Sequence, residues 1–218
     1  SYRIICWGNV SAKTFVNPLR TGDVLTDAYL SNIALRNGTV ATDGDLLYYA
    51  SDNFVLPSSL KATNENIIER TLNFKNAHIK VQVYIKGLID KGTQEQLLPP
   101  IVEMTEVPGS YNFLMQTSSS VIRYFKTTSF QNISGEEMAT ITFYTTRFSN
   151  NSPIEIHIKK SSDGKTLTSI NLKDFMKDNN ITVEGIEEAV VPILIEYKQT
   201  SVEISIPEWA PSPVDPEL

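Results

Sequence analysis

Hydrophobic and polar residues alternate with a period of two along most of this chain. In the opening stretch, SYRIICWGN, the side chains of Tyr2, Ile4 and Cys6 fall on one face of an extended segment. Such alternation predicts β-strands, because successive side chains of a strand point to opposite faces. The predicted strands are Tyr2–Trp7, Asp45–Ala50, Ile67–Phe74, His78–Lys86, Tyr111–Gln116, Val121–Phe125, Ala139–Phe148, Ile154–Lys160, Ala189–Tyr197 and Ser201–Ile206.

A short helix is predicted in the stretch INLKDFMKDNN. Leu172, Phe175 and Met176 share one helical face there, and Asn171 suits the N-cap position. A second candidate, Val24–Leu35, also has apolar residues at helical spacing, although its Thr and Asn residues weaken it. Many short strands with one or two helices predict an all-β fold of the β-sandwich type.

The predicted strands are unevenly distributed, which indicates a domain boundary near residues 73–76. Residues 8–44 are expected to hold one element at most, and a compact domain rarely holds so long a structureless stretch. After the boundary, strands recur at the spacing of a complete seven-stranded sandwich. Residues 1–74 are therefore predicted to be the remaining part of an N-terminal β-sandwich domain. Residues 75–218 are predicted to be a C-terminal β-sandwich domain with a Pro-rich tail, IPEWAPSPVDPEL.

The amino-acid composition argues against several kinds of partner and covalent link. Hydrophobic residues make up 41% of the chain, enough for a core, and the net charge is −6. Because Lys and Arg form no stripe, a nucleic-acid partner is not expected. No segment has the run of about 18 apolar residues that a membrane-spanning helix needs. The single cysteine, Cys6, can form no internal disulfide, and we expect it to be buried in the first strand and unreactive.

The histidines and serines of the sequence give only weak evidence for a catalytic or zinc site. His78 and His157 each lie on a strand pattern and are expected to be partly exposed. A zinc site would need more His or Cys ligands than the chain has. A Ser-His-Asp arrangement with Ser118, Ser119 or Ser120 is conceivable, but no G-x-S-x-G elbow accompanies it.

Acidic and aromatic residues give similarly weak signals. Three carboxylate pairs are sequence neighbours and are expected in solvated turns, not across a glycosidase cleft. The pairs are Asp43/Asp45, Glu136/Glu137 and Glu187/Glu188. Asp43-Gly44-Asp45 hints at calcium but lacks further oxygen ligands and also suits a hairpin turn. Trp7 and Trp209 could form a sugar-stacking platform, although packing of Trp7 in the core is favoured. No catalytic, cofactor-binding or metal-binding residue is predicted, and an enzyme is not expected.

Four segments carry a family resemblance through their order and spacing. They are YRIICWGN, DLLYYAS, NAHIKVQVYIKGL, and a C-terminal series that runs from EIHIKKSSDGKTLTSINLKDFM to VPILIEYKQTSVEISIPEW. Together they resemble the fimbrial anchor and minor subunit lipoproteins (FimB-type, fimbrillin-associated) of anaerobic gut and oral bacteria. The resemblance covers nearly the whole chain.

The resemblance implies an all-β protein of two tandem transthyretin-like β-sandwich domains, the first incomplete at its N-terminus, with one short helix in the second. It implies a structural cell-surface protein of the fimbrium (pilus) and the cell outer membrane, whose partners are other fimbrial subunits. Subunits of this family join by β-strand donation, which needs no cofactor.

In this family a signal peptide, a lipid-bearing cysteine and the first strands precede a segment like SYRIICWGN. The chain is therefore expected to be a truncated or proteolysed form without its lipid anchor, and Cys6 is not the lipidated cysteine. Anchor, tip and stalk roles all stay open. One alternative is a carbohydrate- or host-ligand-binding adhesin module at a fimbrial tip. Another is an enzyme, which would require carboxylates gathered in one cleft.

Overall fold

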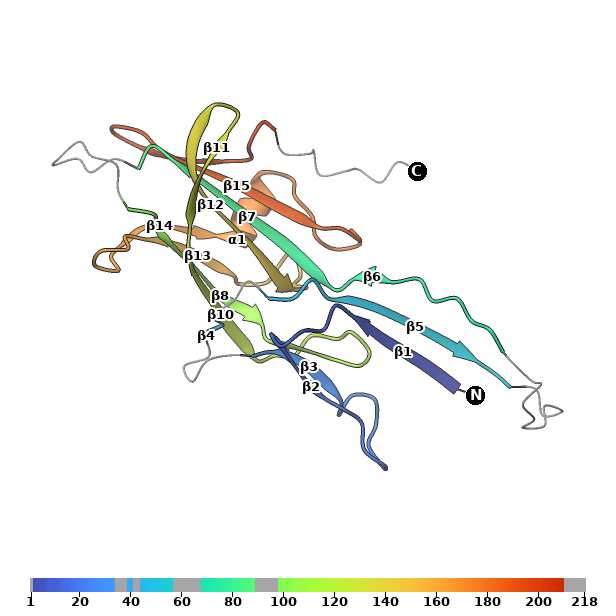
Figure 1. Cartoon of the computed structure of the whole chain (residues 1–218). Coiled ribbons are helices and arrows are strands. Elements are labelled where there is room, and N and C mark those ends of the chain that lie inside the picture. The colour runs from blue at the N-terminus through green and yellow to red at the C-terminus, as the bar shows by residue number, and fades with distance from the viewer. Residues whose placement is uncertain (1, 34–38, 41–43, 57–67, 89–97, 210–218) are drawn as a thin grey trace.

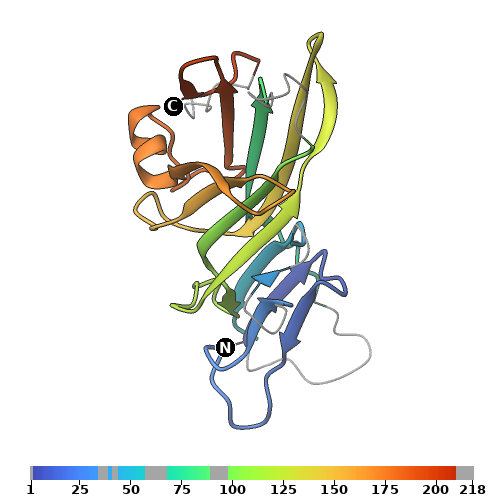
Figure 2. The ribbon, with the colours of Figure 1, turned by 90° about the vertical axis from the view of Figure 1, so that its left-hand side faces the viewer.

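The structure is a computed structural model that describes residues 2–33, 39–40, 44–56, 68–88 and 98–209. It contains two five-stranded sheets and two three-stranded sheets. The five-stranded sheets face each other in a large sandwich, which lies above the two small sheets in Figures 1 and 2. The all-β prediction is confirmed.

The large sandwich holds most of the buried hydrophobic side chains. One sheet has the order β14-β13-β8-β10-β4, with bounds Thr166–Asn171, Glu155–Lys159, Ile101–Pro108, Val121–Thr127 and Thr39–Val40. The other has the order β11-β12-β7-β15-β16, with bounds Ser129–Ile133, Glu136–Thr146, His78–Lys86, Val190–Tyr197 and Val202–Ser205. Most neighbouring strands are antiparallel, but β15 runs parallel to β7, and β4 parallel to β10.

The period-two pattern of the sequence explains the core of this sandwich. In β7 the side chains of Ile79, Val81, Val83 and Ile85 are almost fully buried, and the polar residues between them point away from the core. Facing strands repeat this alternation, so the two inner faces interdigitate. Burial of these side chains supplies the main driving force for folding.

The predicted short helix is confirmed as α1, Leu172–Asp178. Its N-cap is Asn171, whose side-chain oxygen accepts the Asp174 backbone N–H at 3.0 Å. Leu172, Phe175 and Met176 are buried and join the sandwich core. The helix therefore covers one end of the sandwich between β14 and β15, as Figure 2 shows.

The two small sheets pack beside the sandwich. One has the order β1-β5-β6, with bounds Tyr2–Gly8, Tyr48–Phe54 and Lys75–Asn76. The other has the order β2-β3-β9, with bounds Thr14–Asn17, Tyr29–Asn32 and Ser110–Asn112. All strand pairs in the small sheets are antiparallel.

Three strand pairings join the part before residue 75 to the part that begins with it. β3 pairs with β9, β4 pairs with β10 at the edge of the large sandwich, and β5 pairs with β6. A side-chain contact adds to them, since the Asn32 amide donates to the Tyr124 hydroxyl at 3.0 Å. The division of the chain into two domains at residue 74 stays a prediction. If the chain divides there, these pairings and this hydrogen bond join the two domains.

Arg147 ties the start of β7 to the loop before β15. Its guanidinium donates hydrogen bonds to backbone carbonyls of Asn76, His78, Val183, Ile186 and Glu187. A planar guanidinium with five N–H donors suits such a role, because it can satisfy several carbonyls from one position.

Four sequence predictions on strands and helices were wrong. Val24–Leu35 is not a helix within the described residues, because β3 pairs with strands on both sides there. Residues 68–74 form no strand, and only the first residues of Tyr111–Gln116 do. The described part of residues 8–44 contains β2, β3 and β4, three strands where one element was expected.

The central strand β8 was missed altogether. Its sequence, IVEMTEVP, places Glu103 inside the strand, and Glu106 has a positive φ of 60°. The pairing with β10 is also irregular, with a register shift between Ile122 and Tyr124. A bulge of this kind interrupts the period-two pattern that marks a strand in the sequence.

Candidate assembly surface

The small sheets enclose a small aromatic core. The indole of Trp7 on β1 lies 5.0 Å from the ring of Tyr49 on β5 and 5.6 Å from that of Tyr111 on β9. Tyr49 and Tyr111 form a buried cluster with Leu47 and Ala77, and the partly buried Trp7 packs against it. The two sheets therefore meet through three aromatic rings, and packing of Trp7 in the core is confirmed.

Tyr111 connects this small core to the large sandwich. Its hydroxyl donates to the Ala77 carbonyl at 2.6 Å and accepts the backbone N–H of Arg147. Burial raises the pKa of Tyr111 well above its ordinary value, so the phenol stays neutral. A neutral, fully bonded hydroxyl suits a buried junction.

A carboxylate links the segment before β5 to β2. Asp45 accepts hydrogen bonds from the Ser11 backbone N–H at 3.1 Å, the Ser11 hydroxyl at 2.6 Å and the Thr14 hydroxyl at 2.6 Å. Burial by itself would raise the pKa of Asp45, but these hydrogen bonds outweigh it and hold the pKa below its ordinary 3.8. Asp45 is thus a buried structural carboxylate, and the expectation of a solvated turn was wrong for it.

Gly44, next to Asp45, is required for a close approach of two backbones. Its φ is +74°, and a β-carbon at this position would lie 2.2 Å from the carbonyl oxygen of Tyr144. Any other residue would force the two segments apart. Asp43, its other neighbour, lies outside the described residues.

Both small sheets have an edge that no described strand covers. β1 is the outer strand of its sheet and β2 that of the other. The consecutive residues Phe15 and Val16 of β2 are both exposed, by 49% and 37%. Val16 is paired with Leu30 of β3, so the two side chains lie on the same face of the sheet. Leu30 is buried, and the apolar face that it belongs to continues at Val16, where it is exposed. An edge strand with unpaired backbone groups and apolar side chains is a template for a further strand.

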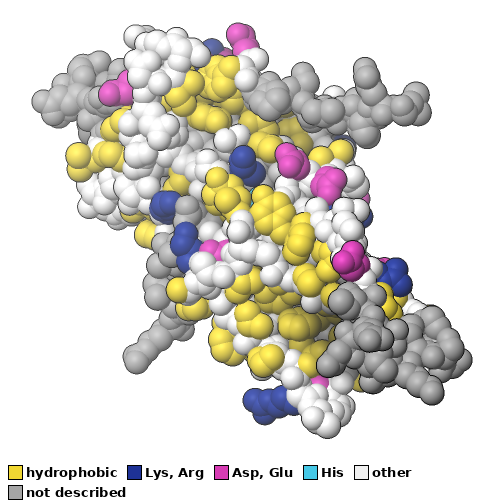
Figure 3. Space-filling model, turned by 45° about the vertical axis from the view of Figure 1, so that its right-hand side comes forward, with side chains coloured by type: hydrophobic (Ala, Val, Ile, Leu, Met, Phe, Trp, Pro, Cys, Tyr) yellow, Lys and Arg dark blue, Asp and Glu magenta, His cyan; other side chains and the backbone are white. Residues whose placement is uncertain are grey.

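Exposed hydrophobic side chains gather on this part of the protein. Figure 3 shows them on the lower part of the molecule, where Figure 1 places β1, β2, β3 and β5. Before residue 75 the large exposed hydrophobic residues are Tyr2, Val10, Phe15, Val16, Leu19, Val24, Tyr29, Ile33, Leu46, Val55, Ile68 and Phe74. The much longer remainder of the described chain has Leu98, Val121, Phe125, Val202, Ile204 and Trp209. A concentration of this kind marks an interaction surface.

The histidines do not join the serines into a catalytic arrangement. His78 is buried, contrary to expectation, and its Nδ1 lies 3.1 Å from the Leu47 carbonyl. Burial lowers the pKa of His78, and the nearby Lys80 and Arg147 lower it further. His157 is partly exposed, as expected, and its Nδ1 lies 2.9 Å from the Ser169 hydroxyl oxygen.

The remaining predicted positions lie on or beside the large sandwich. Glu136 is exposed on β12 and pairs with Lys86 at 3.2 Å, whereas Glu187 and Glu188 are exposed in the loop before β15. Trp209 follows β16, so the structure does not bring it to Trp7, and its ring meets the edge of Tyr84 at 5.8 Å.

Cys6 is only partly buried on β1, so the expectation of full burial was wrong. Among the described residues, no group of three or more His, Cys, Asp and Glu side chains could hold a metal ion. No helix in the described part of the chain is long and apolar enough to cross a membrane.

A family model matches almost the whole sequence. The model of the fimbrillin-A associated anchor proteins Mfa1 and Mfa2 covers residues 1–212. The chain belongs to this family. The resemblance found in the sequence is confirmed, and the chain is a fimbrial protein of the cell surface. A comparison with curated protein sequences finds no match.

Solved structures of similar fold agree with membership of the Mfa2 family. The fimbrial anchor protein Mfa2 from Porphyromonas gingivalis has a TM-score of 0.62 at 15% identity, over 93% of this chain and 74% of that one. A proposed adhesin from Bacteroides ovatus gives 0.65 at 12%, over 95% and 73%. A Bacteroides thetaiotaomicron protein proposed to bind polysaccharide gives 0.61 at 15%, over 90% and 69%. At these identities the likeness shows a shared fold.

Proposed function

We propose that this chain is a fimbrial anchor or minor subunit that takes part in fimbrium assembly by accepting a β-strand from another fimbrial subunit. The uncovered edge of β2 is the acceptor, and the donated strand pairs with it and covers Val16. The single observation that carries the proposal is this open edge, which lies in the part of the protein where exposed hydrophobic side chains are concentrated. Membership of a fimbrial anchor family supports it.

Strand addition fits the chemistry of this edge. Main-chain hydrogen bonds to β2 would provide affinity, and alternate side chains of the donated strand would provide specificity. The side chain of Val16 sits on the same face as buried Leu30, so an added strand would extend an existing apolar layer. The proposed role includes attachment to the outer membrane through a lipid anchor.

The test uses synthetic peptides that match the terminal strands of fimbrial subunits encoded by the same organism. A peptide that binds only the folded protein should raise the melting temperature as its concentration increases. At 100 times its Kd, it should stabilise the folded protein by about 2.7 kcal/mol. We expect at least one such peptide to do so, and a sequence-scrambled peptide not to.

Two matched variants locate the acceptor. Val16→Lys places a charge on the edge of β2, and Val202→Lys places the same charge on β16, an edge strand of the large sandwich. Both valines are exposed, by 37% and 42%, so both variants should fold. Val16→Lys should abolish the peptide-induced shift and Val202→Lys should preserve it. The reverse pattern, or the absence of a shift with every peptide, would contradict the proposal.

A further inference from the structure

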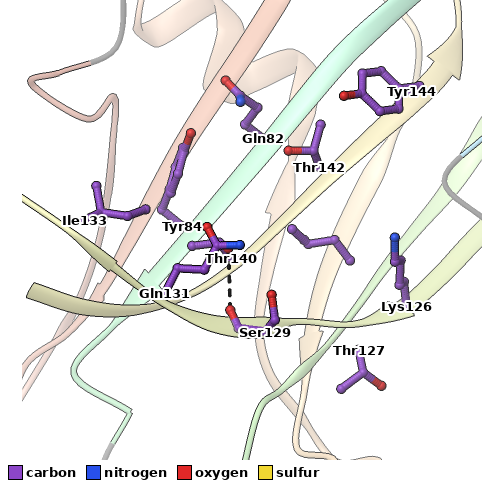
Figure 4. Close-up of a pocket in the computed structure, with 11 residues that line it drawn as sticks. Gln82, Tyr84, Lys126, Thr127, Ser129, Gln131, Ile133, Thr140, Thr142 and Tyr144 are labelled. Atoms are coloured by element: carbon purple, nitrogen blue, oxygen red, sulfur yellow. Dashed lines mark hydrogen bonds between the residues drawn. The ribbon is translucent and has the colours of Figure 1, made fainter. Parts of the chain in front are cut away.

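A polar hollow lies on the large sandwich, away from the edge of β2. Its volume is about 360 Å³, within the range of pockets that hold small ligands. Figure 4 shows its lining side chains along β7 and β12, with the end of β10 and β11 forming the other wall. The residues that line it are Gln82, Tyr84, Lys126, Thr127, Ser129, Gln131, Ile133, Thr140, Ile141, Thr142 and Tyr144.

Strand register brings the polar lining together. β7 and β12 are antiparallel neighbours, and Gln82 is paired with Thr142, while Tyr84 is paired with Thr140. The residues between them on β7, such as Val83, are buried in the sandwich core. The alternation that builds the core on one face of this sheet therefore places amide, hydroxyl and phenol groups in a row on the other.

The lining can form hydrogen bonds in both directions. The amides of Gln82 and Gln131 each present donors and an acceptor, and the hydroxyls of Ser129 and Thr142 can do either. Sugar hydroxyl groups are likewise donors and acceptors at once. A row of amides and hydroxyls in a hollow is therefore complementary to a hydroxyl-rich ligand.

Aromatic rings add apolar surface at two sides of the hollow. Tyr84 is partly buried, and the ring of Trp209 meets it edge-on at 5.8 Å. At the other side lies Tyr144, with the Lys80 Nζ 6.0 Å from its ring centre. Rings with an apolar face and a polar tip can pack on the C–H face of a sugar ring while the hydroxyl bonds to it.

The charge of the hollow favours an uncharged ligand. Among the described residues that line it there is no Asp or Glu, and Lys126 is the only cation. Burial raises the pKa of Tyr84, so its hydroxyl is protonated at neutral pH. A cluster of arginines or lysines, which acidic ligands require, is lacking in that lining.

We propose that this hollow is a binding site for a neutral glycan, in which Gln82 and Thr142 bond to sugar hydroxyls and Tyr84 packs against a sugar ring. The site is separate from the strand-acceptor edge, so it can be correct whether or not the proposed strand exchange occurs. It would give the fimbrial protein a direct contact with saccharide surfaces.

The test is a glycan array followed by isothermal titration calorimetry on the full chain. The array carries neutral oligosaccharides of glucose, galactose, mannose and N-acetylglucosamine, together with sialylated and sulfated glycans. Gln82→Ala removes the central amide, and Thr142→Arg fills the hollow. Their matched controls are Gln199→Ala and Thr200→Arg, two exposed positions in the turn between β15 and β16.

We expect selective binding of a neutral glycan, weakened about tenfold by Gln82→Ala and abolished by Thr142→Arg. Both control variants should bind like the unchanged protein, and circular dichroism should show all four variants folded. The proposal is overturned if no neutral glycan binds, if only sialylated or sulfated glycans bind, or if the control variants lose as much affinity as the variants of the hollow.

Discussion

Replacing Asp45 by alanine removes the carboxylate that links the segment before β5 to β2. Three hydrogen bonds are lost, two from Ser11 and one from Thr14. The Thr14 hydroxyl is buried and is left without this acceptor, which costs about 1–3 kcal/mol. Ser11 is exposed and can turn to water, so its two bonds add less. We expect the free energy of unfolding of this region to fall by about 3 kcal/mol.

The assay follows this region separately from the large sandwich. The chain has two tryptophans, and in a Trp209→Phe background Trp7 alone reports on the small aromatic core. Urea unfolding followed by Trp7 fluorescence then measures the loss. Asp45→Asn is the matched variant, because it keeps the shape but places an amide donor against a hydroxyl, and we expect about half the loss.

The same experiment has a pH signature. The pKa of Asp45 is lower in the folded protein than the ordinary 3.8. Its contribution is therefore complete above about pH 3.9 and is lost as the pH falls through the lower folded value. The difference in stability between the unchanged protein and Asp45→Asn should shrink on acidification below pH 4. A loss under 1 kcal/mol for Asp45→Ala, or a difference that grows in acid, would refute the reasoning.

Three further predictions concern other parts of the fold. Arg147→Lys should lower the free energy of unfolding by about 2–4 kcal/mol in a urea titration, because an ammonium cannot reach the same carbonyls; no loss would contradict the role given to the guanidinium. Asn171→Ala should cost about 1 kcal/mol through loss of the N-cap of α1, whereas Asn171→Ser should restore most of it in the same titration; Asn171→Asp should restore less, because its carboxylate would face Glu155, which accepts the Asn171 amide at 3.0 Å. Cys6→Ala should cost about 1 kcal/mol or less, since the side chain is half-buried, and should leave peptide binding unchanged; a loss of peptide binding would show that β1 belongs to the acceptor.

Much of the large sandwich could be predicted from the sequence. In β7 and β13 the side chains alternate between buried and partly exposed, so the strand and its buried face follow from residue order alone. The apolar run of β15, VVPILIEY, also indicates a strand, but five consecutive residues of it are buried, so it does not show a single buried face. The helix α1 was predictable for the same reason, because its three apolar residues and its cap are all local. The family also follows from the order of such segments.

Other elements depended on partners that are distant in the sequence. The segment Val24–Leu35 has helical spacing, yet Ala28, Leu30 and Asn32 are all buried at a period of two, because β2 and β9 supply hydrogen bonds from either side. The hydrogen bonds between these strands join residues that are far apart in the sequence, so the local propensity of a segment does not predict them. The bulge that hid β8 has the same origin, since it lies in the pairing with β10.

Both candidate sites were decided by tertiary structure. The sequence shows Val16 as one apolar residue in a loop-like stretch, and only the sheet order reveals that it lies on an uncovered edge beside buried Leu30. Gln82 and Thr142 are far apart along the chain and become neighbours only through strand register. Periodicity determines which face of a strand is apolar, whereas the register between strands determines which polar residues meet on the other face.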